Sequence, residues 1–258
     1  MKKTGIAAKI YLSVVTALFF VPIAITVIYS FNASKMPSQW SGFSLVWYGE
    51  LFRDREAFSC LVNSVVLGLL SCAFSVVIGT AGALGMHGRM SRLDRFVRWI
   101  CVLPVMIPEV ILGMAYLAVF SLLGLPFGMV TLVIAHTTFC VPYVFLVVSG
   151  RLSGLNMNAV MAARDLGATP MEAFRDVTLP MLLPGIASGV ILSFAMSFDD
   201  VIISVFVAGA GVNTLPVHIY TRLKTGVTPE INALSALLVL AVAAGVILVN
   251  AVLPKKRR

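Results

Sequence analysis

Apolar runs of about 20 residues recur along this 258-residue chain, and they constrain its fold more than any other feature. A helix of that length crosses the ~30 Å hydrocarbon core of a bilayer, because it rises 1.5 Å per residue. Only 12% of the residues are charged, against roughly 25% in a soluble domain. We therefore predict an all-α integral membrane protein and exclude a soluble enzyme, a disordered regulator and a disulfide-stapled secreted module. The six predicted spans are Ile10–Phe31, Leu61–Met86, Trp99–Leu123, Met129–Ser149, Pro184–Ala208 and Ile231–Leu253.

The connections between these spans are short, so we predict one transmembrane domain over residues 1–258. The first span follows Lys2, Lys3 and Lys9 and could be a signal peptide. Its apolar run of about 20 residues exceeds the 7–15 residues of a signal-peptide core, which favours an uncleaved anchor.

The distribution of basic residues predicts the orientation of the spans. With the N-terminus inside, fourteen of the nineteen Lys and Arg residues lie on the cytoplasmic side, which places both termini in the cytoplasm. The net charge of +8 lies in short clusters between apolar runs, so it does not indicate nucleic acid. The outer segment Gln39–Phe52 is rich in aromatic residues and either lies at the membrane interface or forms a solvated loop. The four cysteines lie singly, which argues against a metal site.

The cytoplasmic loop 150–183 has the pattern of helix, glycine turn and helix. Asn158 is a suitable N-cap, and Gly167 can end the first helix in the left-handed conformation. Thr169 to Glu172 form a capping box with proline at the first helical position, and the second helix should stop near Leu179–Pro180. The first helix carries small residues at Ala159, Ala162 and Ala163, so it either enters a groove on a partner or caps the underside of the bundle.

The same loop resembles the EAA signature of ATP-binding-cassette (ABC) import permeases, EAA-x3-G-x9-I-x-L-P. The spacing from Met161-Ala162-Ala163 through Gly167 to Val177-Thr178-Leu179-Pro180 matches at every position. Met161 stands where the family usually has Glu, and Val177 replaces Ile. In that family the first helix sits in a cleft of the ATPase subunit. The resemblance therefore implies coupling roles for Ala159, Met161, Ala162, Ala163, Asp165, Leu166, Gly167 and Pro180.

Further strings resemble the second permease subunit of spermidine/putrescine importers. They are Pro104–Glu109, Ala135–Phe139, Ser197–Asp200 and the run from Gly226 through Val227 and Thr228 to Ala233. The resemblance implies a type I importer permease of the inner membrane, working with a homologous second permease, two ATP-binding cassette subunits and an extracytoplasmic binding protein. The chain has no phosphate-binding G-x-x-x-x-G-K-[ST] loop. We expect it to be no enzyme and to bind no cofactor, with ATP and Mg held by the partner ATPase. An iron or aminophosphonate permease is the alternative within the class.

The predicted spans contain three acidic residues, Glu109, Asp199 and Asp200, and no Lys or Arg. Ionisable groups within a bilayer are costly and usually functional. Acids mixed with aromatic residues such as Phe198 and Tyr220 suit a cation that carries ammonium groups on an apolar stem. Alternatively, the acids pair with a partner subunit or stay protonated, and a channel or secondary transporter could use Asp199 and Asp200 as an ion site.

Two further expectations concern the interior of the spans. Pro104 and Pro108 should loosen the third span beside Glu109. His136 within the fourth span is best explained as a core histidine whose hydrogen bonds are satisfied.

Overall fold

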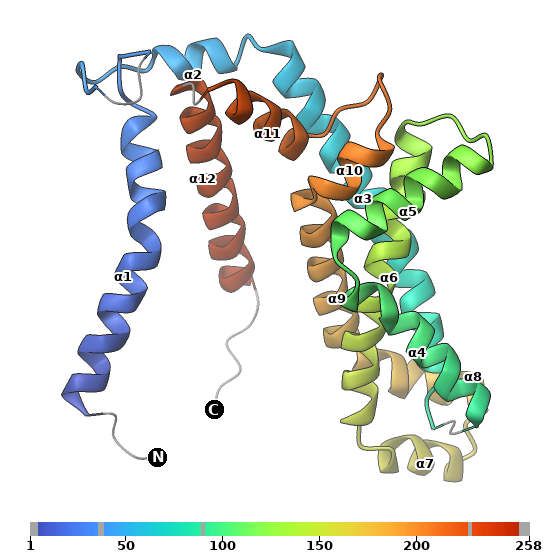
Figure 1. Cartoon of the computed structure of the whole chain (residues 1–258). Helices are drawn as coiled ribbons and strands as arrows, with labels where there is room; N and C mark the ends of the chain where they lie inside the picture. The colour runs from blue at the N-terminus through green and yellow to red at the C-terminus, as the bar shows by residue number, and fades with distance from the viewer. Residues whose placement is uncertain (1–4, 36–38, 89–90, 227–228, 253–258) are drawn as a thin grey trace. The chain divides into compact units, whose positions relative to one another are not determined.

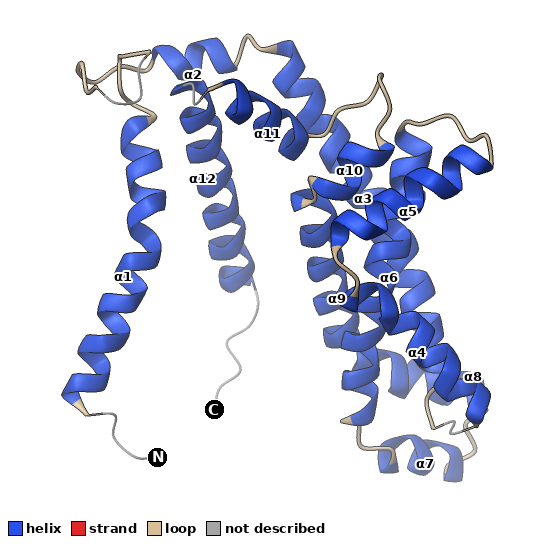
Figure 2. Ribbon diagram, viewed as in Figure 1, coloured by secondary structure: helices blue, strands red, loops and turns tan. Residues whose placement is uncertain are grey.

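The computed structural model describes residues 5–35, 39–88, 91–226 and 229–252 (Figure 1). Within these residues the regular elements are helices (Figure 2). Some residues on which the sequence-based predictions rest lie outside the described residues. They are Lys2, Lys3, Arg89, Val227, Thr228, Leu253 and the basic cluster 255–258. The helices are α1 (Ile6–Tyr29), α2 (Val46–Leu51), α3 (Arg55–Gly85), α4 (Arg92–Met106), α5 (Glu109–Leu122), α6 (Met129–Ser153), α7 (Asn158–Asp165), α8 (Pro170–Ala173), the π-helix η1 (Phe174–Thr178), α9 (Leu179–Asp199), α10 (Ile202–Val207), α11 (Leu215–Thr225) and α12 (Pro229–Val252).

Four helical segments are long and apolar enough to cross a membrane, namely α1, α3, α6 and the continuous stretch Pro170–Asp199. The bent pair α4 and α5 makes a fifth if it is counted as one span, and α12 contributes a shorter apolar helix over Pro229–Gly245. The described residues therefore form an all-helical fold with four to five candidate spans. They fall into two compact units, one of Ser59–His218 and the other of Met1–Phe58 with Ile219–Arg258.

The third predicted span, Trp99–Leu123, is interrupted, as its prolines led us to expect. α4 and α5 are bent by 110° at a break of two residues, Ile107 and Pro108. Proline lacks an N–H and disfavours helical conformation in the residue before it, and Ile107 is extended with φ −87° and ψ 133°. Pro104 was expected to loosen the same span but remains within α4. The break therefore lies directly before Glu109.

The fifth predicted span also differs, because its helix begins earlier and ends earlier than Pro184–Ala208. α8 passes through the π-helix η1 directly into α9, so the second loop helix does not stop at Leu179–Pro180 as predicted. The wider π turn accommodates Pro180, whose ring would otherwise clash with the preceding helical turn. α9 ends at Asp199, Asp200 is extended, and α10 follows as a separate short helix.

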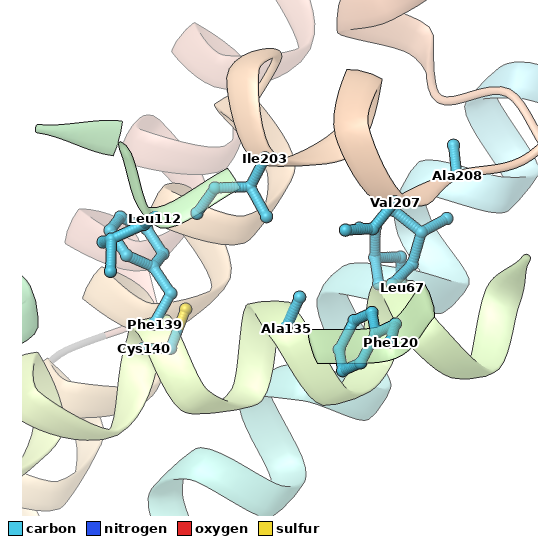
Figure 3. Close-up of a cluster of buried hydrophobic side chains, with 10 residues drawn as sticks. Leu67, Leu112, Phe120, Ala135, Phe139, Cys140, Ile203, Val207 and Ala208 are labelled. Atoms are coloured by element: carbon cyan, nitrogen blue, oxygen red, sulfur yellow. The ribbon is translucent and has the colours of Figure 1, made fainter. Parts of the chain in front are cut away.

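The core of the Ser59–His218 unit is built around α6. Its buried residues pack with α5 and α10 and with Leu67 of α3 (Figure 3). Glycines of α3 and α9 allow close contact with α6. A Cβ at Gly79 would lie only 2.8 Å from Val144 of α6, and one at Gly189 of α9 would lie 3.3 Å from the same side chain. The cluster comprises Leu67, Leu112, Phe120, Leu132, Ala135, Phe139, Cys140, Ile203, Val207 and Ala208.

The other unit packs α1 and α2 against α12. The buried Asn32 organises the aromatic segment after α1: its side chain donates to the Gln39 carbonyl and accepts from Ser41 N–H, while its own carbonyl accepts from the Trp47 indole. Arg222 of α11 connects the two sequence segments of this unit, because it forms ion pairs with Asp54 at 3.2 Å and with Glu230 at 3.4 Å.

Candidate functional site

The three acids of the predicted spans gather at two helix breaks. Glu109 lies in the first turn of α5, Asp199 ends α9, and Asp200 follows it. The breaks are brought together because α5 packs against α10, where a Cβ at Gly113 would lie 2.4 Å from the Phe206 ring. Glu109 interacts electrostatically with both aspartates. The site therefore concentrates negative charge where two helices interrupt their backbone hydrogen bonding.

The two adjacent aspartates differ completely in environment. The Asp200 carboxylate is buried and accepts hydrogen bonds from Ile203 N–H at 3.2 Å, Ser204 N–H at 2.8 Å and the Ser204 hydroxyl at 2.9 Å. It thus caps α10 through the helix's unpaired N–H groups. His136 Nε2 lies 3.4 Å from the same carboxylate. Asp200 is therefore fixed inside the protein.

Asp199 is exposed instead, and no described residue forms a hydrogen bond or ion pair with its carboxylate. Phe198 beside it is half-buried and stacks on Phe194 with ring centroids 5.7 Å apart. Tyr220 belongs to the other unit, and there Lys224 Nζ lies 4.5 Å from its ring centroid. Of the predicted pathway residues, the structure thus groups Glu109 with Asp199 and Asp200, and gives Tyr220 a cation from its own helix.

A buried polar network that the sequence did not reveal links Asp200 to residues of four helices, α3, α6, α9 and α10. The fully buried His136 of α6 bonds Ser197 of α9 through Nδ1 at 2.9 Å and Ser204 of α10 through Nε2 at 3.1 Å. Ser197 also bonds Ser71 of α3 at 2.8 Å. The expectation of a satisfied core histidine is confirmed. The available signal was a pair of serines four residues apart on each of two spans, Ser71 with Ser75 and Ser193 with Ser197, which meet across the interface.

The predicted coupling segment forms the short helix α7. Asn158 is its first residue and not its cap; the Asn156 side chain accepts from Asn158 N–H at 3.0 Å and satisfies that end. Gly167 has φ +96°, which confirms the left-handed turn. Most of the residues implied in coupling are exposed, with Leu166 at 90%, while Ala163 is half-buried. The exposed ones are Ala159, Met161, Ala162, Asp165, Leu166, Gly167 and Pro180.

The capping box after Gly167 is confirmed. Glu172 accepts from Thr169 N–H at 2.7 Å and from its hydroxyl at 2.8 Å, while Glu172 N–H donates to that hydroxyl at 3.3 Å. These hydrogen bonds to the ionised form lower the pKa of Glu172 below its ordinary value. Arg175 pairs with Asp176 at 2.7 Å, which lowers the pKa of Asp176. The start of the helix that continues into α9 is thus fixed by exposed polar contacts.

Comparison with known proteins supports the signature in this loop. Residues 75–254, which include α7 and both acid-bearing breaks, match the family described as binding-protein-dependent transport system inner membrane component. The chain belongs to this family. It is accordingly a multi-pass inner-membrane permease component of a transport system and not itself an enzyme.

Among curated proteins, the chain is 41% identical over 231 residues to the putrescine transport system permease protein PotI of Escherichia coli K12, covering 86% of this chain and 82% of the relative. It is 35% identical over 238 residues to the spermidine/putrescine transport system permease protein PotC of Haemophilus influenzae, covering 92% and 93%. Among solved structures, a chain of a bacterial ABC transporter involved in alginate import matches with TM-score 0.71 at 14% identity, covering all of both chains. A chain of the MetNI methionine ABC transporter matches with TM-score 0.63 at 20% identity, covering 81% and 95%. These structural matches establish the ABC importer permease fold.

Proposed function

We propose that the chain is the permease subunit of an ATP-driven ABC importer that moves polyamines of the spermidine and putrescine type into the cytoplasm. The observation that carries the proposal is the exposed carboxylate of Asp199 at a helix break, which pairs with no described residue and interacts electrostatically with Glu109. The spans predicted from the sequence contain no Lys or Arg. The relatives named for spermidine and putrescine transport support the same substrate class.

The chemistry of the site favours such a cation. A polyamine carries several ammonium groups on an apolar stem, so carboxylates lower its barrier and aromatic faces attract its charges. Asp199 and Glu109 supply the carboxylates, and Phe198 supplies an adjacent aromatic ring. The pathway role of Tyr220 rests on the sequence alone and stays a prediction. Asp200 has a positioning role, because its hydrogen bonds to α10 hold the helix break next to Asp199 in place.

The proposed assembly includes ATPase subunits, because the chain has no ATP-binding loop of the G-x-x-x-x-G-K-[ST] type and exposes the short helix α7. It forms one transmembrane domain of six spans with both termini in the cytoplasm, supported by the distribution of Lys and Arg. A homologous second permease completes the pathway, and an extracytoplasmic binding protein delivers the substrate. Two ATP-binding cassette subunits hold ATP and Mg, and each receives a coupling helix such as α7 in a cleft.

Replacing Asp199 by Asn tests the pathway without disturbing the fold, because no described residue bonds this carboxylate. We expect polyamine uptake by proteoliposomes containing the assembled importer to fall by tenfold or more, since a loss of 1.4 kcal/mol in stabilising the passing cation suffices. Asp199→Glu keeps the charge and should retain most of the uptake.

Equal uptake by Asp199→Asn and the unaltered importer would contradict the assignment. The basal ATPase rate and the amount of co-purified ATPase serve as controls and should be equal in both variants. Asp200→Asn is unsuitable as a first test, because it replaces one of the two carboxylate oxygens that accept hydrogen bonds from α10 with an NH2 group.

A further inference from the structure

A basic cavity lies between the ends of α3, α4 and α6 in the Ser59–His218 unit. Its volume is about 330 Å³, at the lower end of the range of small-ligand sites. The polar residues that line it are His87 after the end of α3, Arg95 and Arg98 of α4, and Ser149 and Ser153 of α6. No residue assigned to the substrate pathway or to the coupling segment contributes to this cavity.

Helical spacing explains why these groups converge. Arg95 and Arg98 are three residues apart on α4, and Ser149 and Ser153 are four apart on α6, so each pair shares one face of its helix. α4 packs against α6, and the buried Ala83 of α3 leaves room beside them. Two guanidinium groups and an imidazole thus share the cavity with two hydroxyl groups.

The positive charge of the cavity is not neutralised within the described part of the chain. No acidic residue is among the described residues that line it, and neither arginine forms an ion pair with a described residue. Arg98 is nevertheless held in place: its guanidinium lies 5.9 Å from the Phe145 ring centroid, and Nη2 donates to the Met86 carbonyl at 3.4 Å. Its other N–H groups remain available to a ligand, as does the Ser149 hydroxyl, which bonds no described residue.

We propose that this cavity binds a phosphate group, carried by an anionic phospholipid of the cytoplasmic leaflet. The planar guanidinium group matches phosphate oxygens with paired hydrogen bonds, and basic pockets at the cytoplasmic ends of membrane helices suit anionic headgroups. A free phosphate compound offers the same chemistry, so the experiment needs an arm that separates it from the lipid headgroup. The cytoplasmic placement rests on the proposed orientation of the spans.

A bound phosphate would join the N-terminal half of α4 to the C-terminal end of α6. α6 leads through the short connection 154–157 to α7. The occupied cavity would therefore brace the base of the coupling segment, which gives the site a role distinct from substrate passage.

The test is lipid retention by the purified full chain, measured by native mass spectrometry after reconstitution in nanodiscs of phosphatidylglycerol mixed with phosphatidylcholine. Arg95→Gln removes a lining charge, and Arg92→Gln makes the same change at an exposed position of α4 outside the lining. We expect Arg95→Gln to weaken phosphatidylglycerol binding about tenfold, because a hydrogen bond between charged groups is lost, and Arg92→Gln to change it less than twofold. Arg98→Lys keeps the charge but loses the planar guanidinium group that makes paired hydrogen bonds, so it should weaken phosphatidylglycerol binding to an intermediate extent.

A second arm uses inorganic phosphate with nanodiscs of phosphatidylcholine alone. One outcome would overturn the lipid as the source of the phosphate but retain the phosphate site. In it, the chain binds inorganic phosphate, Arg95→Gln abolishes that binding, and the chain does not prefer phosphatidylglycerol to phosphatidylcholine. Equal losses in Arg92→Gln and Arg95→Gln would overturn the site, since net charge alone would then explain binding. These measurements require neither polyamine nor ATPase, so their outcome is independent of the transport proposal.

Discussion

At the residue scale, neighbouring identical side chains have different roles. Asp199 and Asp200 are equivalent in the sequence, and both were expected to face the pathway. The structure exposes Asp199 and buries Asp200 in a network with His136 and Ser204. The sequence indicated that His136 is a satisfied core residue, but its partners lie 61 and 68 positions away along the chain. Such pairing depends on helix packing, which local patterns do not specify.

Replacing His136 by Leu should destabilise the protein by about 1–3 kcal/mol, because Ser197, Ser204 and Asp200 each lose a buried partner. His136→Gln offers one donor and one acceptor in place of the two ring nitrogens and should recover part of the loss. Thermal unfolding of the detergent-solubilised chain measures both effects. A His136→Leu variant as stable as the unaltered chain would show that the network contributes nothing.

At the scale of elements, the helix breaks were only partly predictable. Pro108 signalled the break before α5, whereas Pro104, Pro180 and Pro184 are all accommodated within helices. The break between α9 and α10 has no proline; it depends on Asp200 accepting the first N–H groups of α10. In the coupling loop, where the contacts are local, the glycine turn and the capping box were predicted correctly. Local rules therefore worked best where no other helix interferes.

The contact of α5 with α10 predicts the effect of a single methyl group. Gly113→Ala would place a Cβ 2.4 Å from the Phe206 ring and should cost about 1–3 kcal/mol through overpacking. Gly150→Ala is the matched control, since a Cβ at this glycine of α6 meets nothing within 4 Å. Gly113→Ala should therefore lower the unfolding midpoint and Gly150→Ala should not, and equal midpoints would contradict the packing described.

The exposed face of α7 predicts a separable loss of coupling. Ala162→Leu adds bulk on the small-residue face and should abolish stimulation of the ATPase by the loaded binding protein, because the helix would no longer fit a cleft. Ala is replaced by another good helix former, so insertion and stability should be unchanged. Normal stimulation in the assembled Ala162→Leu importer would indicate that the helix only caps the bundle.

At the scale of the whole molecule, the sequence established the class of protein because lipid demands long apolar helices and the loop signature has fixed spacing. The family match over residues 75–254 agrees with that interpretation. The predicted span Trp99–Leu123 consists of two helices joined at Ile107 and Pro108, and Pro184–Ala208 is divided between α9 and α10. Hydropathy does not distinguish a continuous helix from two apolar pieces joined by a break. The breaks that hydropathy missed are the places where the acids gather.

Uptake of radiolabelled putrescine and spermidine tests the central claim most directly. The measurement uses proteoliposomes that contain the chain with its second permease, its ATPase and its binding protein. We predict saturable accumulation of polyamine. It should require ATP on the side of the membrane that the ATPase faces, and it should disappear when the ATPase is omitted. Accumulation without the ATPase would indicate a channel or secondary transporter, and ATP-driven uptake of another solute with none of either polyamine would contradict the proposed substrate.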